Sequence, residues 1–251
     1  SASGAPQGSA PGVAEFVYRA RPGDTLIGLS ARLLLEPRRW PELQRRNAIA
    51  DPRRIPLGSR IRIPYDWLRL SSQPARVLER AGDARVDGRE VAVGAEVADG
   101  ALTLGFGDGS VLAVQPASRL RLERLQRVEG AGADESVLML ERGKLEMKVR
   151  PRGDMGRFEI RTPAAVSAVR GTEFRAGYRD DGAATTETLD GLVGVDAGGA
   201  GVAVEAGFGT RAEPGRPPLP PVALLPAPAL EAVAALHDTA GRGWALPPVG
   251  G

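Results

Sequence analysis

Few residue types in this chain could carry out covalent or metal chemistry. Cysteine is absent, and the single histidine is His237. Thiol catalysis, cysteine-ligated metals, Ser-His-Asp triads and histidine metal sites therefore have no support. The sequence leaves paired carboxylates for glycoside hydrolysis open, although no acidic cluster indicates them. We predict that the protein is not an enzyme and holds no cofactor or metal.

Two short motifs have the spacing of ligand-binding loops. Residues 105–109 have glycine at every second position, as in a nucleotide-binding loop, but no helix follows them, so a hairpin turn is favoured. Residues 180–182, Asp-Asp-Gly, could begin a calcium loop, but the further acidic ligands are missing. We interpret both segments as turns.

Charge is distributed unevenly along the chain. Residues 16–64 contain eleven Arg and four acidic residues, a net charge of +7, whereas residues 65–251 have a net charge of −4. A basic head favours an anionic surface, and charge alone leaves cell-wall polymer, lipid headgroups and nucleic acid open. The alternative is a compositional bias without function, because the chain has 31 Arg and only two Lys.

The basic segment has the pattern of a strand, two helices and a strand. A strand begins at Phe16–Tyr18, and Asp24 is expected to cap a helix with one apolar face of leucines. A second helix is expected from about Trp40 to Arg46, with Pro41 in its first turn. A closing strand follows at Arg60–Ile63. The apolar face of the first helix consists of Leu26, Leu29, Leu33 and Leu34.

This segment resembles the LysM family along residues 16–64. The matching motifs are Tyr18-x4-Gly23-Asp24-Thr25-Leu26, Trp40-x2-Leu43-x3-Asn47-x-Ile49-x-Asp51-Pro52 and Ile55-Pro56-x-Gly58-x3-Ile61-x-Ile63-Pro64. The resemblance implies a βααβ fold and binding of peptidoglycan or another N-acetylglucosamine polymer between two loops. The residues that it implies for this binding are Gly23, Asp24, Thr25, Leu26, Ile27, Asp51, Pro52, Arg53 and Ile55.

The roles of individual loop residues remain open at this stage. Backbone groups of the two loops can bond an acetamido group, and Leu26 and Ile55 are expected to seat its methyl. The alternative is that Asp24 and Thr25 only cap the helix and that Leu26 belongs to the core. For Asp24, helix capping is favoured over a sugar contact, and Asn47 is interpreted as a helix C-cap. Residues 27–30, Ile-Gly-Leu-Ser, depart from the usual LysM pattern, as does the high arginine content.

From about residue 75 to 206 the apolar residues alternate with polar ones, which is typical of β-strands. Leu102, Leu104 and Phe106 precede a turn at residues 107–110. A second hairpin is predicted to turn at residues 141–144, Glu-Arg-Gly-Lys. Turn signals recur every 8–12 residues and no helix intervenes, which predicts an all-β domain.

The all-β stretch resembles the FecR-type domain. Its most specific motif is Ile160-x-Thr162-Pro163 followed by Ala168-Val169-Arg170-Gly171-Thr172-Glu173-Phe174. The resemblance implies a periplasmic, β-solenoid-like stack of twisted hairpins that contacts protein partners in envelope signalling. The anti-sigma members also have a cytoplasmic part and a membrane helix, which we do not find in this sequence, so a sigma-regulating role is not predicted.

The motif Arg170, Gly171, Thr172, Glu173 and Phe174 has two interpretations. It could fix a tight backbone path with an internal ion pair between Arg170 and Glu173, or it could form a partner surface. The first is favoured.

The remaining segments complete the predicted organisation. Residues 1–15 are expected to be a flexible leader, residues 16–64 a LysM module, 65–74 a connector and 75–210 a FecR-type domain. Residues 211–251 are expected to be a Pro-rich linker and tail, with a short helix at 229–236 and room for a further domain beyond. No run of 18 apolar residues indicates a membrane span.

Two functional hypotheses follow from these patterns. In the first, a non-catalytic protein of the periplasm or cell surface of a Gram-negative bacterium binds peptidoglycan through residues 16–64 and presents a β-scaffold to an envelope protein. In the second, the chain is a structural part of a larger sensor or secretion-linked assembly, and its LysM-like module packs against protein rather than glycan. Neither hypothesis involves nucleic acid.

Overall fold

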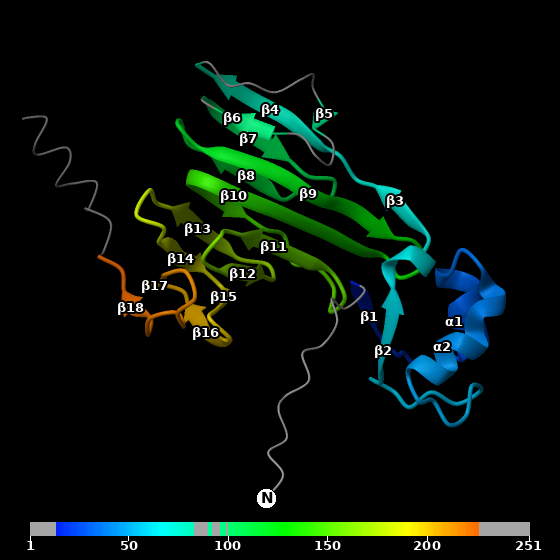
Figure 1. The fold of residues 1–251 in the computed structure, drawn as a ribbon. Helices are drawn as coiled ribbons and strands as arrows, with labels where there is room; N and C mark the ends of the chain where they lie inside the picture. Colours follow the sequence, from blue (N-terminus) through cyan, green and yellow to red (C-terminus); the bar gives the residue numbers. More distant parts are fainter. Residues whose placement is uncertain (1–13, 83–89, 92–95, 99, 226–251) are drawn as a thin grey trace, which may run out of the picture.

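The computed structural model describes residues 14–82, 90–91, 96–98 and 100–225 (Figure 1). A small N-terminal module, residues 15–67, lies at one end of a large curled mixed sheet. The predicted mostly-β fold with a small strand-and-helix region is therefore confirmed. The predicted helix at 229–236 and His237 lie outside the described residues.

The N-terminal module has the predicted order of strand, helix, helix and strand. Its two strands pair in antiparallel register, with Phe16 opposite Ile63 and Tyr18 opposite Ile61. Leu26, Leu29 and Leu33 lie on one face of the first helix and are fully buried. The elements are β1 (Glu15–Arg19), α1 (Leu26–Leu33), η1 (Pro37–Arg39), α2 (Trp40–Arg46), β2 (Arg60–Pro64) and η2 (Tyr65–Trp67).

The curled sheet follows the module without a helix in its described part. Its strands are β3 (Leu70–Ser72), β4 (Ala75–Ala81), β5 (Glu90–Val91), β6 (Glu96–Ala98), β7 (Ala101–Gly105), β8 (Val111–Val114), β9 (Arg119–Val128), β10 (Ala133–Lys148), β11 (Arg157–Arg161), β12 (Val166–Val169), β13 (Glu173–Tyr178), β14 (Ala184–Asp190), β15 (Leu192–Ala197), β16 (Ala200–Glu205), β17 (Phe208–Ala212) and β18 (Val222–Ala223). Several pairs of consecutive strands are antiparallel, including the predicted β7–β8 hairpin.

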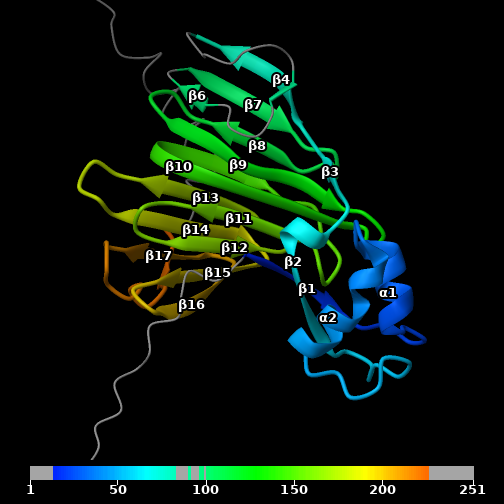
Figure 2. The ribbon, with the colours of Figure 1, turned by 45° about the vertical axis from the view of Figure 1, so that its right-hand side comes forward.

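The 16-residue strand β10 joins these hairpins into one sheet. Its first part pairs with β9 in antiparallel and with β11 in parallel register. Its second part pairs with β8 and β13, both antiparallel. One strand therefore has different neighbours along its two halves, and the sheet curls around the apolar side chains between them (Figures 1 and 2).

The predicted turn at residues 141–144 is wrong, because β10 continues through it. Gly143 has a φ of +92°, and the pairing with β9 is irregular between Leu140 and Arg142. A glycine at positive φ is the signal of a turn and also of a bulge within a strand, so the sequence alone did not distinguish them. Here the bulge lies where β10 changes partners.

Two apolar cores are present, and the smaller one is shared between the module and the sheet. The larger core lies inside the curled sheet and includes Leu138, Phe158 and Phe174. The smaller core combines the buried side chains of the module with sheet residues, so the module is packed onto the sheet and not tethered to it. The sheet residues in this shared core are Val128, Ala131, Ala133 and Met155.

The sheet extends beyond residue 210, into the range expected to be a Pro-rich linker. β17 pairs with β18, and the Thr210 hydroxyl donates a hydrogen bond of 2.6 Å to the carbonyl of Leu219. The chain between these strands therefore folds back on the sheet.

Replacement of Gly143 by alanine should strongly destabilise the protein. An added Cβ would lie 2.2 Å from the Ser118 hydroxyl oxygen and 2.5 Å from its Cα, in addition to the cost of positive φ. Gly199 is the matched control, because its φ is +79° and no atom lies within 4 Å of an added Cβ. In urea denaturation, Gly143→Ala should lower the free energy of unfolding by about 2 kcal/mol more than Gly199→Ala does. Equal losses would contradict the described packing.

Candidate functional site

The structure brings together the two loops that were predicted to bind glycan. The backbone N–H of Leu26 donates a hydrogen bond of 2.8 Å to the carbonyl of Pro52. Gly23, Ile27 and Arg53 are exposed, as is Asp51. Residues 23–27 and 51–55 therefore form one continuous surface of the module.

Thr25, and not Asp24, caps helix α1. The Thr25 hydroxyl accepts a hydrogen bond of 3.1 Å from the N–H of Gly28, which is the geometry of an N-cap. The carboxylate of Asp24 instead accepts hydrogen bonds from the Arg21 N–H at 2.7 Å and the Tyr18 hydroxyl at 2.8 Å. The expectation that Asp24 caps the helix is wrong, since its neighbour in sequence takes that position.

Asp24 also forms an ion pair with Arg32, at 3.1 Å. Burial alone would raise the pKa of Asp24. The hydrogen bonds from Arg21, Tyr18 and Arg32 outweigh this effect, and the net result is a lowered pKa. Because the side chain of Asp24 is only 8% exposed and already has these partners, its role is to hold the loop in place.

The prediction that Leu26 and Ile55 seat an acetamido methyl group is wrong, because both side chains are buried. Leu26 has no exposed surface and Ile55 is 9% exposed, so both belong to the core of the module. A helix residue that points inward packs against the strands and is not accessible to a ligand. Ile27, which is 48% exposed, is the apolar side chain that these loops present to solvent.

Asp51, Pro52 and Arg53 form the second loop through local contacts. The Asp51 carboxylate accepts a hydrogen bond of 2.8 Å from the Arg53 N–H, which closes an Asx turn. Asn47, at the end of α2, is a C-cap as predicted. Its side chain also bonds both backbone groups of Arg62, at 2.7 and 3.0 Å, and so connects α2 to β2.

The motif at residues 170–174 forms a tight crossing from β12 to β13. Gly171 has a φ of +59°, and an added Cβ would lie 3.0 Å from Pro151. Thr172 and Phe174 are buried. The predicted ion pair between Arg170 and Glu173 is wrong. Glu173 pairs with Lys148 at 3.4 Å, because β13 lies beside β10 in the sheet.

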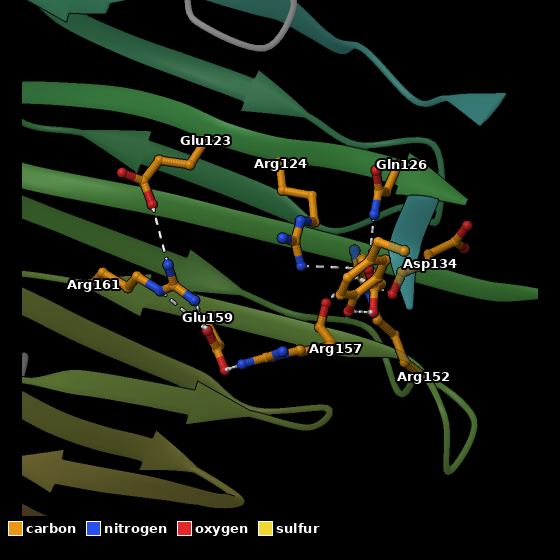
Figure 3. A network of polar contacts seen from close by, with 10 residues as sticks. Glu123, Arg124, Gln126, Asp134, Arg152, Arg157, Glu159 and Arg161 are labelled. Carbon is orange, nitrogen blue, oxygen red and sulfur yellow. Dashed lines mark hydrogen bonds and ion pairs between the residues drawn. The ribbon is translucent and has the colours of Figure 1, made fainter. Parts of the chain in front are cut away.

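A polar network on β9, β10 and β11 was not predicted from the sequence (Figure 3). Glu135, which is 2% exposed, accepts hydrogen bonds from the Tyr65 hydroxyl at 2.6 Å and from Gln126 at 3.0 Å. Arg124 lies 4.2 Å above the Tyr65 ring and 3.8 Å from Glu135. Burial, followed by the charge of Glu135, raises the pKa of Tyr65 well above its usual range. The network links the module to the sheet.

Arg152 is the most buried cation of this region, with 5% of its side chain exposed. It donates to the Asp108 carboxylate at 2.6 Å, to the carbonyl of Arg157 at 2.7 Å and to the Ser136 hydroxyl at 3.1 Å. Asp108 also accepts the Ser110 N–H at 2.9 Å, which closes the turn between β7 and β8. These contacts confirm that residues 105–109 form a hairpin turn.

On β11, three charged residues alternate on one face of the strand. Glu159 pairs with Arg157 and, at 3.1 Å, with Arg161, and Arg161 also reaches Glu123 at 3.4 Å (Figure 3). Alternate residues of a strand share a face, so the sequence spacing could have indicated this row. Its partners on β9 depend on the register between strands, which the sequence does not show.

A groove of about 640 Å³ lies between β1 and the sheet. The segment 154–157 and residues of β12 and β15 form its other side. In the part of the chain that the structure describes, no group of three or more His, Cys, Asp or Glu residues is placed to hold a metal ion.

The comparison with known protein families finds a match within the sheet. The family model described as FecR protein matches residues 89–194. Residues 89–194 are a FecR domain. The match does not extend to residues 16–64, so the LysM interpretation of the module rests on its motifs and on its order of elements. No curated protein matches the chain significantly.

Two solved structures show a distant likeness, and both are crystal structures of a "putative anti-sigma factor" from Parabacteroides distasonis. The first is 17% identical over 56% of this chain and 64% of that chain, with a TM-score of 0.42. The second is 14% identical over 68% of this chain and 73% of that chain, with a TM-score of 0.40. The alignment thus spans less than two thirds of the first structure.

Among the described residues, no helix is long and apolar enough to cross a membrane.

Replacement of Asp24 by asparagine should destabilise the protein at neutral pH by about 1–2 kcal/mol, because charge-assisted hydrogen bonds in the loop weaken. The pKa of Asp24 is lower in the folded protein than in the unfolded chain, so the ionised carboxylate stabilises the fold above the unfolded pKa, about 3.9. This stabilisation is lost as the pH falls through the folded pKa. In urea denaturation, the difference from wild type should therefore shrink as the pH falls below about 4. A pH-independent difference would contradict this role.

Proposed function

We propose that the protein is a non-catalytic protein of the bacterial cell envelope that attaches to peptidoglycan through its N-terminal module and presents its FecR domain to a protein partner. The proposal is carried by the geometry of the module. One side of it is packed onto the FecR domain, while the two loops are joined elsewhere and expose Gly23, Ile27, Asp51, Arg53 and Arg54.

The two surfaces of the module do not compete. Docking uses the end of α1: the backbone N–H of Arg69 donates a hydrogen bond of 2.8 Å to the carbonyl of Leu33, and an added Cβ on Gly130 would lie 2.6 Å from Arg32. The loops start at the opposite end of α1, where Thr25 caps the helix. A polymer could therefore reach the loops while the module stays docked.

The charge of the module also favours an anionic polymer such as peptidoglycan. Residues 16–64 have a net charge of +7. Arg53 and Arg54 are exposed in the second loop, which the hydrogen bond between Leu26 and Pro52 joins to the first loop. Attachment would then combine contacts of loop backbone with electrostatic attraction, and the second part would weaken with salt.

The match of residues 89–194 to the FecR family model supports a protein-binding role for this domain, because the FecR resemblance implies contacts with protein partners in envelope signalling. We propose that the protein acts in the periplasm or on the cell surface, where such envelope partners occur. Beyond the matched residues, the sheet offers exposed apolar side chains near its last strands, among them Phe208, Val222 and Leu225, of which 38%, 66% and 93% are exposed.

A second candidate function has its own supporting observation. The shared core with Val128, Ala131, Ala133 and Met155 shows that the module packs against protein within this chain. In this alternative the module is a structural part of a larger sensor or secretion-linked assembly, and its loops do not bind glycan.

Sedimentation with purified peptidoglycan sacculi distinguishes the two functions. The full chain should sediment with sacculi, and Ile27→Glu should reduce the bound fraction at least about fivefold, because it places a carboxylate on the exposed loop surface. Leu35→Glu is the matched control: Leu35 is 61% exposed in the same module but lies beyond the other end of α1. It should bind like wild type.

Two outcomes would contradict glycan attachment through the loops. One is sedimentation no greater than that of an unrelated basic protein. The other is equal loss of binding in both variants. If 0.5 M salt (about a 4 Å Debye length) abolishes sedimentation of the wild type, the attachment is electrostatic and not lectin-like.

A further inference from the structure

The groove between β1 and the sheet borders a strand edge. It is lined on one side by Glu15, Val17 and Arg19 of β1, and on the other by residues 154–157 and by β12 and β15. Figure 2 shows β1 between β2 and the ends of β12 and β15. At about 640 Å³, its volume is within the range of sites that hold small ligands or short peptides.

The backbone of β1 points into this groove at every second residue. Val17 lies opposite Arg62, but both backbone groups of Arg62 are bonded by the side chain of Asn47 on the far edge of β2. Val17 and Arg62 are therefore a pair without mutual hydrogen bonds, and the N–H and C=O of Val17 face the other edge of β1.

Arg19 confirms this orientation, because its N–H contacts the sulfur of Met155 across the groove at 3.4 Å. Glu15, Val17 and Arg19 are alternate residues of β1, so the backbone groups of Glu15 face the same edge as those of Val17 and Arg19. The edge of β1 thus presents backbone donors and acceptors at Glu15 and Val17, which is the arrangement that accepts an added strand.

The floor of the groove has room for such a strand. Ala168 and Gly194 are paired neighbours on β12 and β15. A Cβ added to Gly194 would have only the carbonyl of Ala168 within 4 Å, at 3.9 Å. Leu192 at the side is 50% exposed and offers apolar contact.

The charges around the groove favour an acidic occupant. Three of its carboxylates already have arginine partners: Glu15 pairs with Arg46, Asp154 with Arg19 at 3.5 Å, and Glu159 with Arg157. Glu135 is buried against Tyr65.

Two arginines remain for a ligand. Arg60 lies directly opposite Arg19 on β2, and Arg170 contacts the carbonyl of Asp154 at 3.4 Å. Within the described parts of the chain, no ion pair joins Arg60 or Arg170 to a carboxylate. Asp154 already pairs with Arg19, so a carboxylate from outside would pair with Arg60.

We propose that this groove binds an extended, acidic segment of a partner protein, which adds a strand to the edge of β1 at Glu15 and Val17 and pairs its carboxylates with Arg60 and Arg170. The proposal rests on the protein-binding role given above and specifies where that partner binds. Residues 1–13 of this chain contain no acidic residue, so they do not offer the required carboxylates.

A labelled peptide tests the proposal directly. The probe is a blocked seven-residue peptide of alternating valine and glutamate, titrated with the full chain by fluorescence anisotropy. Lysine in place of glutamate gives the charge control, and proline in place of two valines gives the strand control. The glutamate peptide should bind saturably, and both control peptides should bind at least about tenfold more weakly.

Variants and hydrogen exchange locate the binding. The double variant Arg60→Glu, Arg170→Glu should lower the affinity for the glutamate peptide at least about tenfold. The control is Arg38→Glu, at an exposed position on η1, which should leave the affinity unchanged. Bound peptide should slow exchange of the Val17 amide.

Three results would overturn the proposal: no binding up to about 1 mM peptide, equal binding of the lysine peptide, or binding without slower exchange at Val17. None of these depends on sedimentation with sacculi. Failure here with intact sedimentation would remove the groove site alone, and failure of sedimentation alone would remove wall attachment.

Discussion

Backbone hydrogen bonding along β10 is the constraint on which the rest of the structure depends. The strand has β9 and β11 as neighbours in its first part and β8 and β13 in its second, so the apolar faces of both parts close on one core. This exchange of partners needs a backbone irregularity, which Gly143 provides against Ser118. The buried pair of Arg152 and Asp108 then ties the loop after β10 to the turn between β7 and β8.

The same strand positions the N-terminal module. The turn before β10 supplies Ala131 to the shared core, and the first part of β10 supplies Ala133 and the buried Glu135 that bonds Tyr65. The module is therefore held on one side by apolar packing and by a buried polar network. Its loops remain on another side, and the edge of β1 borders the groove beside the sheet. In the functions that we propose, this small module would bind glycan through its loops and a protein segment through the edge of β1.

Patterns between neighbours in sequence predicted local structure well, but they did not predict which distant residues and strands pair. The leucine spacing in α1, Asn47 as a C-cap and the turn at residues 107–110 followed from neighbours in sequence. Asp24 and Thr25 are both residue types that favour an N-cap, so the sequence does not distinguish them. In the structure it is the Thr25 hydroxyl that accepts the Gly28 N–H. Glu173 pairs with Lys148, 25 residues away, and the β10–β11 pair is parallel. Such partners depend on register. Leu26 lies on the apolar face that the leucine spacing indicates, and its burial, together with that of Ile55, removes the expected apolar seat.

The account requires that the module and the FecR domain behave as one body, because the groove along β1 exists only between them. Native-state hydrogen exchange with increasing denaturant measures this directly. The amides of α1 and those of the first part of β10 should exchange through the same global opening, with the same free energy and the same dependence on denaturant. Exchange of the α1 amides through a separate opening of lower free energy, while β10 stays protected, would contradict the account.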